Sequence, residues 1–217
     1  MKYIHLHALL LMFVFCTSCG GQNKTDSSKE KIKSDPTYKY TDAIGKRLLI
    51  QNGFPKGEKY TDPNGKEYFK IIFWTRISNE TDTPLELKIN FPEDSYEVPA
   101  LPGKYYKILV PPDTMTVDKE PLFNYGLTDL NFFLDNNLSK PSSLKRTIHP
   151  KESSGFYVVI LRPTSEGANG TLRTGLSLKG QDLFYRIKLL EPKSFRVIYD
   201  KEILCGSISL KKLKLQK

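Results

Sequence analysis

Histidine and cysteine are scarce in this chain, with three of each among 217 residues. His5 and His7 lie at the amino-terminal end, which leaves His149 for the rest of the chain. His149 precedes a proline and no nucleophile-elbow serine motif accompanies it, so we expect no Ser-His-Asp or Cys-His site. The scarcity also argues against a histidine-rich metal site. We therefore expect no metal, no cofactor and no enzymatic activity.

The cysteines are too few and too unevenly placed for a disulfide framework. Cys16 and Cys19 lie close to the amino terminus, and Cys205 stands alone between Leu204 and Gly206. With no partner for an internal disulfide, Cys205 is predicted to be a small buried hydrophobic residue. A reactive or intermolecular thiol is the alternative.

No apolar run is long enough to span a bilayer. The longest of the amino-terminal region, residues 8–16, has nine apolar residues, whereas a spanning helix needs roughly 20 and a signal-peptide core roughly 7 to 15. Lys2 precedes this run and the small residues Thr17 and Ser18 follow it. We expect residues 1–18 to be an export signal.

The sequence Thr17-Ser18-Cys19-Gly20-Gly21 resembles the lipobox of bacterial lipoprotein precursors, with Cys16 where that family usually has Leu or Val. The resemblance covers the first 21 residues. It implies that Cys19 becomes the first residue and carries a diacylglycerol on its sulfur and an acyl chain on its amino group. Two or three acyl chains make membrane attachment effectively permanent. An ordinary secretory signal cleaved elsewhere is the alternative.

The residues after Cys19 bear on location. Gly20 stands where enterobacterial lipoproteins retained at the inner membrane carry Asp, so the resemblance favours the outer membrane. Residues 22–26 loosely resemble a surface-export motif of Bacteroidota, which leaves the periplasmic and surface faces both open. Residues 19–37 are polar with Ile32 as the only large apolar side chain. They are predicted to be a disordered tether in front of a domain at 38–217.

The chain is basic, with a formal charge of +9 that becomes +8 when Lys2 is removed with the signal. Its cations are 26 Lys against 7 Arg, and Lys is a solvated point charge rather than the planar fork used for phosphate recognition. We expect no nucleic-acid partner. A soluble surface explains the charge, and attraction to anionic lipid or polysaccharide is the functional alternative.

Beyond Tyr38, apolar residues recur with the period of two that is typical of β-strands. Residues 69–78 are predicted to form a half-buried strand and residues 85–91 a second one, joined as a hairpin by the turn-forming residues 79–84. Further strands are predicted at 105–110, 156–161, 172–179, 183–190, 195–199 and 203–210. Residues 156–161 are apolar on both faces, which indicates a central strand. Many short strands separated by Pro, Gly and Asn indicate a sandwich or a barrel. The pattern resembles immunoglobulin-like β-sandwich modules of exported bacterial proteins, and this resemblance implies an all-β, immunoglobulin-like sandwich.

One segment has the spacing of a helix. Leu127, Leu130, Leu134 and Leu138 recur three or four residues apart, and Thr128 is a candidate amino-terminal cap. A short helix is therefore predicted within an insertion at 111–141.

Carboxylates offer the remaining route to catalysis, because glycoside hydrolysis uses two of them at a set separation. The candidate pairs are Glu93 with Asp94 and Asp129 with Asp135, and solvated surface acids explain both. The sequence Asp62-Pro63-Asn64-Gly65 lacks calcium-loop spacing. It is predicted to be a hairpin turn, since Asn-Gly supplies positive φ.

Two further features are candidate interaction sites. Trp74 and Tyr68 lie on the same nominally outward face of the strand at 69–78 and form a possible aromatic binding patch, for example for sugars. Packing under a second layer is the alternative. Asp113-Thr114-Met115 resembles the O-glycan attachment site of exported Bacteroidota proteins, with Thr114 as the modified residue.

Two classes of function follow from these observations. The first is a non-enzymatic, lipid-anchored envelope protein whose sandwich binds or scaffolds a protein or glycan partner. The second is a carboxylate-dependent envelope glycan hydrolase. An immunity or inhibitor lipoprotein is a third possibility that the sequence does not separate from the first.

Overall fold

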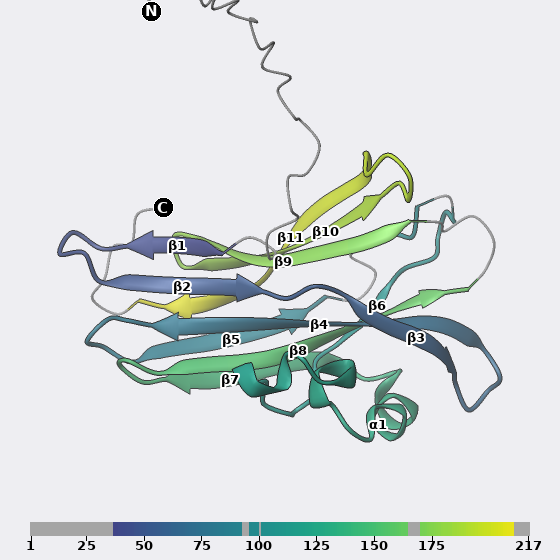
Figure 1. Ribbon diagram of the computed structural model, residues 1–217, viewed down its shortest axis with the longest axis horizontal. Coiled ribbons are helices and arrows are strands. Elements are labelled where there is room, and N and C mark those ends of the chain that lie inside the picture. The colour runs from purple at the N-terminus through teal and green to yellow at the C-terminus, as the bar shows by residue number, and fades with distance from the viewer. Residues whose placement is uncertain (1–36, 93–95, 100, 165–169, 211–217) are drawn as a thin grey trace, which may run out of the picture. The chain divides into compact units, whose positions relative to one another are not determined.

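Two antiparallel β-sheets form most of the computed structural model, which describes residues 37–92, 96–99, 101–164 and 170–210 (Figure 1). In the first sheet the strand order is β1-β2-β4-β8-β6, and β3 also pairs with β4. In the second it is β7-β5-β11-β10-β9. The first sheet contains β1 (Tyr38–Thr41), β2 (Arg47–Asn52), β3 (Lys56–Thr61), β4 (Glu67–Asn79), β6 (Lys107–Leu109) and β8 (Ser153–Pro163). The second contains β5 (Leu85–Phe91), β7 (Ser142–Ile148), β9 (Thr171–Lys179), β10 (Asp182–Leu190) and β11 (Val197–Ser209).

The main hydrophobic core lies between the two sheets, so the predicted all-β sandwich is confirmed. Alternate residues of most strands point into it, which is the consequence of the two-residue period. The central strands supply much of it, with Ile71, Phe73 and Ile77 from β4, Phe156, Val158 and Ile160 from β8, and Leu85, Leu87 and Ile89 from β5.

A second apolar cluster lies on the opposite face of β4 and β8. Tyr68, Ile72 and Trp74 of β4 pack there with Tyr157, Val159 and Leu161 of β8 and with residues of the insertion. The strand predicted at 69–78 is confirmed as part of β4, but it is not half-buried, because the insertion covers the face that would otherwise meet solvent. The prediction that 156–161 is a central strand is confirmed, since β8 lies between β4 and β6.

The insertion contains the predicted helix, α1 (Leu130–Asn137), and two short 3₁₀ turns, η1 (Val117–Lys119) and η2 (Phe123–Gly126). Leu130 and Leu134 are the buried residues of α1. The cap differs from the prediction: Asp129, with φ of 51°, occupies the position expected for Thr128, and its side chain makes no capping hydrogen bond. Among the described residues, none of the helices has the length and apolarity that a bilayer crossing requires.

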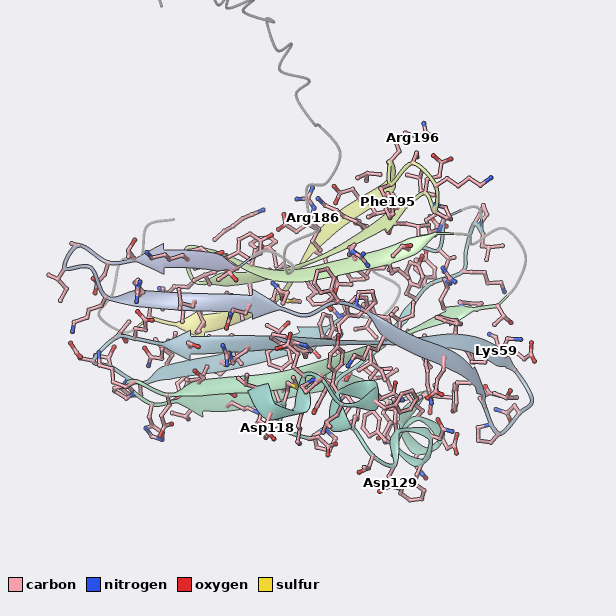
Figure 2. All side chains as sticks on the ribbon, in the orientation of Figure 1. Lys59, Asp118, Asp129, Arg186, Phe195 and Arg196 are labelled. Carbon is pink, nitrogen blue, oxygen red and sulfur yellow. The ribbon has the colours of Figure 1, made fainter. Side chains whose placement is uncertain are left out.

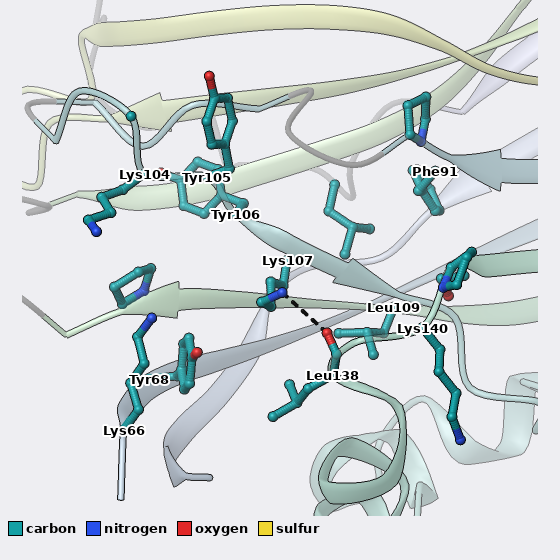
Figure 3. Close-up of a pocket in the computed structure, with 16 residues that line it drawn as sticks. Lys66, Tyr68, Phe91, Lys104, Tyr105, Tyr106, Lys107, Leu109, Leu138 and Lys140 are labelled. Atoms are coloured by element: carbon teal, nitrogen blue, oxygen red, sulfur yellow. Dashed lines mark hydrogen bonds between the residues drawn. The ribbon is translucent and has the colours of Figure 1, made fainter. Parts of the chain in front are cut away.

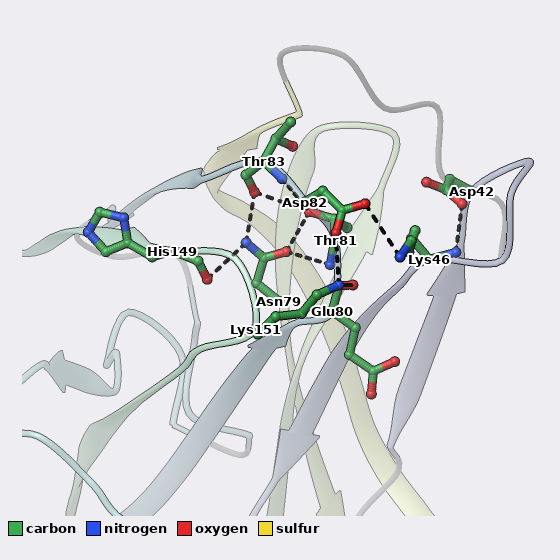
Figure 4. Close-up of polar contacts among 9 residues, drawn as sticks. All are labelled: Asp42, Lys46, Asn79, Glu80, Thr81, Asp82, Thr83, His149 and Lys151. Carbon is green, nitrogen blue, oxygen red and sulfur yellow. Dashed lines mark hydrogen bonds and ion pairs between the residues drawn. The ribbon is translucent and has the colours of Figure 1, made fainter.

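The predicted hairpin between residues 69–78 and 85–91 is wrong, because β4 and β5 belong to different sheets. The connection crosses the sandwich at a polar corner built around Asn79 (Figure 4). The Asn79 amide donates to the carbonyls of Thr83, Ile148 and His149, and its Oδ1 accepts from the N–H and hydroxyl of Thr81. These bonds hold the chain in a crossover in which the next strand cannot pair with β4.

The remaining differences concern strand number and length. Residues 195–199 and 203–210 were predicted as two strands, and residues 197–209 form the single strand β11, with an irregular register against β10. The strands β1, β2, β3 and β7 were not predicted. The predicted turn at residues 62–65 is confirmed, since β3 pairs with β4 across it, Asp62 Oδ1 accepts from the N–H groups of Asn64 and Lys66, and Gly65 has φ of 78°.

Candidate functional site

Strand β8 brings together segments that lie far apart in the sequence. It pairs with β4 on one side, where Tyr68 faces Pro163, and with β6 on the other, where Lys107 faces Leu161. The end of β5 and the residues between α1 and β7 reach the same end of the sandwich. An open surface depression forms where these segments meet.

This depression is a cavity of about 240 Å³, which we call the lysine cavity (Figure 3). Four segments and Pro163 form its walls. The lining residues are Lys66 before β4 and Tyr68 on it, Phe91 at the end of β5 and Pro92 after it, Gly103 to Leu109 leading into and along β6, Leu138, Lys140 and Pro141 before β7, Ser142 at its start, and Pro163 at the end of β8.

Four lysines line this cavity: Lys66, Lys104, Lys107 and Lys140. All four are exposed and, within the described part of the chain, none forms an ion pair. Lys107 Nζ donates to the Leu138 carbonyl at 3.2 Å, and Lys66 Nζ lies 5.2 Å from the centre of the Tyr68 ring. No described lining residue carries a carboxylate. The described lining of the cavity is therefore positively charged, and one described carboxylate lies beside it, since Glu97 Oε1 accepts a hydrogen bond from the Gly103 N–H at 2.7 Å.

Aromatic and proline side chains form the rest of the walls. Tyr68 and Tyr106 are buried, and Tyr105 is half-buried. Burial raises the pKa of Tyr106 to about 12, so its phenol stays neutral at physiological pH. The hydroxyl of Ser142, another lining residue, is already engaged in the fold. Its Oγ accepts a hydrogen bond from the Val110 N–H at 2.6 Å. The described cavity thus offers cations and apolar faces, a combination suited to binding.

The predicted aromatic patch does not form an exposed row. Tyr68 and Trp74 are 4% and 8% exposed and pack in the second apolar cluster. Trp74 meets Tyr125 edge-on with ring centres 6.5 Å apart, and its indole N–H has no hydrogen-bond partner. Gly53 makes this position possible, since a Cβ there would lie 2.2 Å from Trp74 Nε1. Tyr68 reaches solvent only as a wall of the lysine cavity.

Of the two predicted modification sites, Thr114 lies within the described residues and Cys19 does not. Thr114 is exposed, in an isolated bridge with Phe156, so its hydroxyl is accessible to a modifying enzyme. Cys19 lies outside the described residues, as do the predicted signal and nearly all of the predicted tether.

His149 and Cys205 have no catalytic surroundings in the described structure. His149 is exposed after β7, and hydrogen bonds involve its backbone carbonyl rather than its imidazole. Cys205 is 2% exposed, as predicted, and its Sγ donates to the Leu183 carbonyl at 3.4 Å. Burial raises the pKa of its thiol to about 12, which keeps it protonated and unreactive.

The carboxylate pairs proposed from the sequence do not converge in a described pocket. Asp129 is the exposed residue that starts α1, and Asp135 accepts a hydrogen bond from the Tyr60 hydroxyl at 2.7 Å. Glu93 and Asp94 directly follow Pro92 of the lysine cavity and lie outside the described residues. Within the described residues, no group of three His, Cys, Asp or Glu side chains is placed to hold a metal ion.

Sequence reasoning did not single out the four cavity lysines. They come from the β3–β4 turn, the approach to β6, β6 itself and the segment before β7, so no short motif unites them. The available signal was the overall composition, with 33 basic against 24 acidic residues, which does not tell where on the surface the excess charge lies. Their position depends on how β4, β6 and β8 pair.

No protein-family model, curated protein or solved structure matches this chain. Its function is therefore argued from its own residues.

Proposed function

We propose that this chain is a lipid-anchored protein of the bacterial envelope whose β-sandwich binds a partner without catalysing a reaction. The observation that carries the binding role is the lysine cavity, in which four lysines and three tyrosines line one depression and no described lining residue is acidic. Unpaired cations at a concave surface with apolar walls favour recognition of a complementary group.

The location rests on the lipobox-like residues that end at Cys19. Lipid on this cysteine would hold the domain at the membrane, and the outer membrane is favoured because Gly20 replaces the retention signal. The partner would then be a component of the same envelope, either a protein or a glycan.

A glycan hydrolase is the competing function. Its chemistry needs two carboxyl groups roughly 5 to 10 Å apart around the scissile bond. The described walls of the lysine cavity supply ammonium groups instead, and Asp135 is already hydrogen-bonded to Tyr60. These placements support a binding role over hydrolysis.

Metabolic labelling with an alkyne fatty acid tests the anchor. We expect the wild-type protein and the control variant Cys205→Ala to incorporate label and to sediment with membranes. Cys19→Ala should incorporate none, because the acceptor sulfur is gone. Labelling that persists in Cys19→Ala, or a soluble wild-type product, would contradict the anchor.

A second assay tests the absence of catalysis. The mature lipoprotein is incubated with envelope polysaccharide, and newly formed reducing ends are measured. We expect none above the buffer blank. Reducing ends that disappear in a Glu93→Gln/Asp94→Asn variant would instead identify a hydrolase.

A further inference from the structure

We propose that the lysine cavity is the binding site for an acidic polysaccharide, a glycan chain whose sugars carry carboxylate groups. This inference rests on the proposed binding function and specifies the chemical class of its ligand. Lys66, Lys104, Lys107 and Lys140 provide the positive charge, and the half-buried Tyr105 and the lining prolines provide apolar surface for the sugar rings.

The charge of the cavity selects an anion. Each of the four ammonium groups is exposed and without a described carboxylate partner, whereas several basic residues elsewhere are already engaged in ion pairs. Lys70 pairs with Glu58, for example, and Arg186 with Asp200. A ligand carboxylate at the cavity would therefore form new ion pairs without having to break existing ones.

The kind of cation distinguishes among anions. The cavity is lined by lysine and contains no described arginine, whereas arginine provides the planar fork that recognises one phosphate with two parallel hydrogen bonds. Lysines on different walls of the cavity instead suit anionic groups that repeat along a chain. This arrangement favours a polyanion over a single small phosphate.

The apolar walls favour a sugar. Tyr105 is half-buried and, with Pro92, Pro141 and Pro163, contributes apolar surface beside the lysines, whereas the lining rings of Phe91 and Tyr106 are each 4% exposed. A cavity of about 240 Å³ is below the roughly 300 Å³ at which pockets for drug-sized ligands begin. One sugar unit of a longer chain can therefore occupy it, with its neighbours outside on the basic rim.

The test is a binding titration of the mature lipoprotein, held in non-ionic detergent, against three probes. These are alginate as the carboxylated glycan, dextran as the neutral glycan, and vesicles of phosphatidylglycerol. We expect saturable binding to alginate that weakens as salt is added, because salt screens exposed charges. Binding to dextran should be at least about tenfold weaker, the consequence of losing two exposed ion pairs.

Two double variants locate the site. Each removes two positive charges, so the two variants have the same net charge. Lys66→Gln/Lys104→Gln removes two cavity charges. Lys88→Gln/Lys145→Gln removes two exposed charges that face each other across β5 and β7. We expect the cavity variant to bind alginate about tenfold more weakly and the control variant to bind as the wild type does.

Several results would overturn the inference. They are the absence of alginate binding, equal weakening in both variants, equal affinity for dextran, or preference for vesicles over alginate. Failure of the proposed function would be seen separately, as release of reducing ends or as loss of lipid from the wild-type protein.

Discussion

At the scale of single residues, Lys70 shows how a buried charge is accommodated. Its side chain is 4% exposed, and Nζ contacts Glu58 Oε1 at 2.9 Å and Asn131 Oδ1 at 2.5 Å. The hydrogen bond from Lys70 lowers the pKa of Glu58. Since Glu58 lies on β3, Lys70 on β4 and Asn131 on α1, one ammonium group links the sheet to the insertion.

We predict that Lys70→Ala lowers the free energy of unfolding by about 2 kcal/mol, because it removes the donor of Asn131 Oδ1 and leaves Glu58 with the Asn124 amide in place of its ion pair. Lys59→Ala is the matched control on the neighbouring strand, where the side chain is exposed (Figure 2). Urea unfolding followed by the fluorescence of Trp74 measures both. Equal stability of the two variants would contradict the role given to Lys70.

Buried acids with raised pKa values make stability depend on alkaline pH. Burial raises the pKa of Cys205 from 9.0 to about 12 and that of Tyr106 from 10.0 to about 12. The unfolded chain releases these protons near pH 9 to 10, whereas the folded chain keeps them until about pH 12. In this window the folded state binds more protons, so stability falls as pH rises.

We predict that the free energy of unfolding is fully retained below about pH 9 and declines from there towards pH 12, by up to about 1.4 kcal/mol per pH unit for each group. Burial also raises the pKa of Tyr157 to about 12, so several groups contribute, and the decline should be shallower in Cys205→Ala, which lacks one of them. Urea titrations at about pH 8 and about pH 11 test this. A decline of the same size in Cys205→Ala would exclude the thiol as a cause.

At the scale of elements, the crossover from β4 to β5 depends on the side chain of Asn79. Its amide and Oδ1 satisfy groups of Thr81, Thr83, Ile148 and His149. We predict that Asn79→Ala costs about 3 kcal/mol of stability, because several buried polar groups lose their partners together.

The control for this prediction is Asn64→Ala in the exposed turn between β3 and β4. Because the Asn64 side chain is exposed, we expect a change of less than about 0.5 kcal/mol. Thermal and urea unfolding compare the two variants. If Asn79→Ala were as stable as Asn64→Ala, the crossover would have to be held by other contacts.

The alternation of apolar residues predicted several strands correctly, including β5 and β10, because their buried positions recur every second residue. It did not predict β1, β2, β3 or β7. In β3 only Tyr60 is buried, and in β7 only Leu144 and Ile148 are. Alternation also indicates which face of a strand is buried, but it does not indicate which other strand pairs with it. The β4–β5 hairpin was wrongly predicted for this reason, since a turn and a crossover use the same polar residues.

At the scale of the whole described unit, β4 and β8 contribute to both apolar clusters. Their alternate residues face the core between the sheets on one side and the insertion on the other. The second cluster therefore cannot lose its packing without exposing the strands that carry the first. We expect the sandwich and the insertion to unfold together.

This cooperativity can be measured with two probes of the same urea titration. Trp74 fluorescence reports on the second cluster, and far-ultraviolet circular dichroism reports on the sheets. We predict coincident transitions with the same midpoint and slope. A Trp74 transition that precedes the loss of β-structure would show that the insertion unfolds alone.

The candidate site is built from segments that are far apart in the sequence, which is why the sequence alone did not reveal it. Lys66 and Lys140 are 74 positions apart and meet at one cavity through the pairing of β4 and β6 with β8. The sequence showed an excess of lysine and no catalytic motif. It drew attention to Trp74, which the fold buries, because position on a strand face does not tell whether an insertion will cover that face.

Hydrogen–deuterium exchange of the mature lipoprotein, with and without alginate, tests the central claim most directly. If the lysine cavity binds the glycan, backbone amides at residues 103–109 and 138–142 become protected and those of β9 and β10 do not change. Protection confined to β9 and β10, or spread evenly over all exposed basic segments, would contradict the assignment of the site.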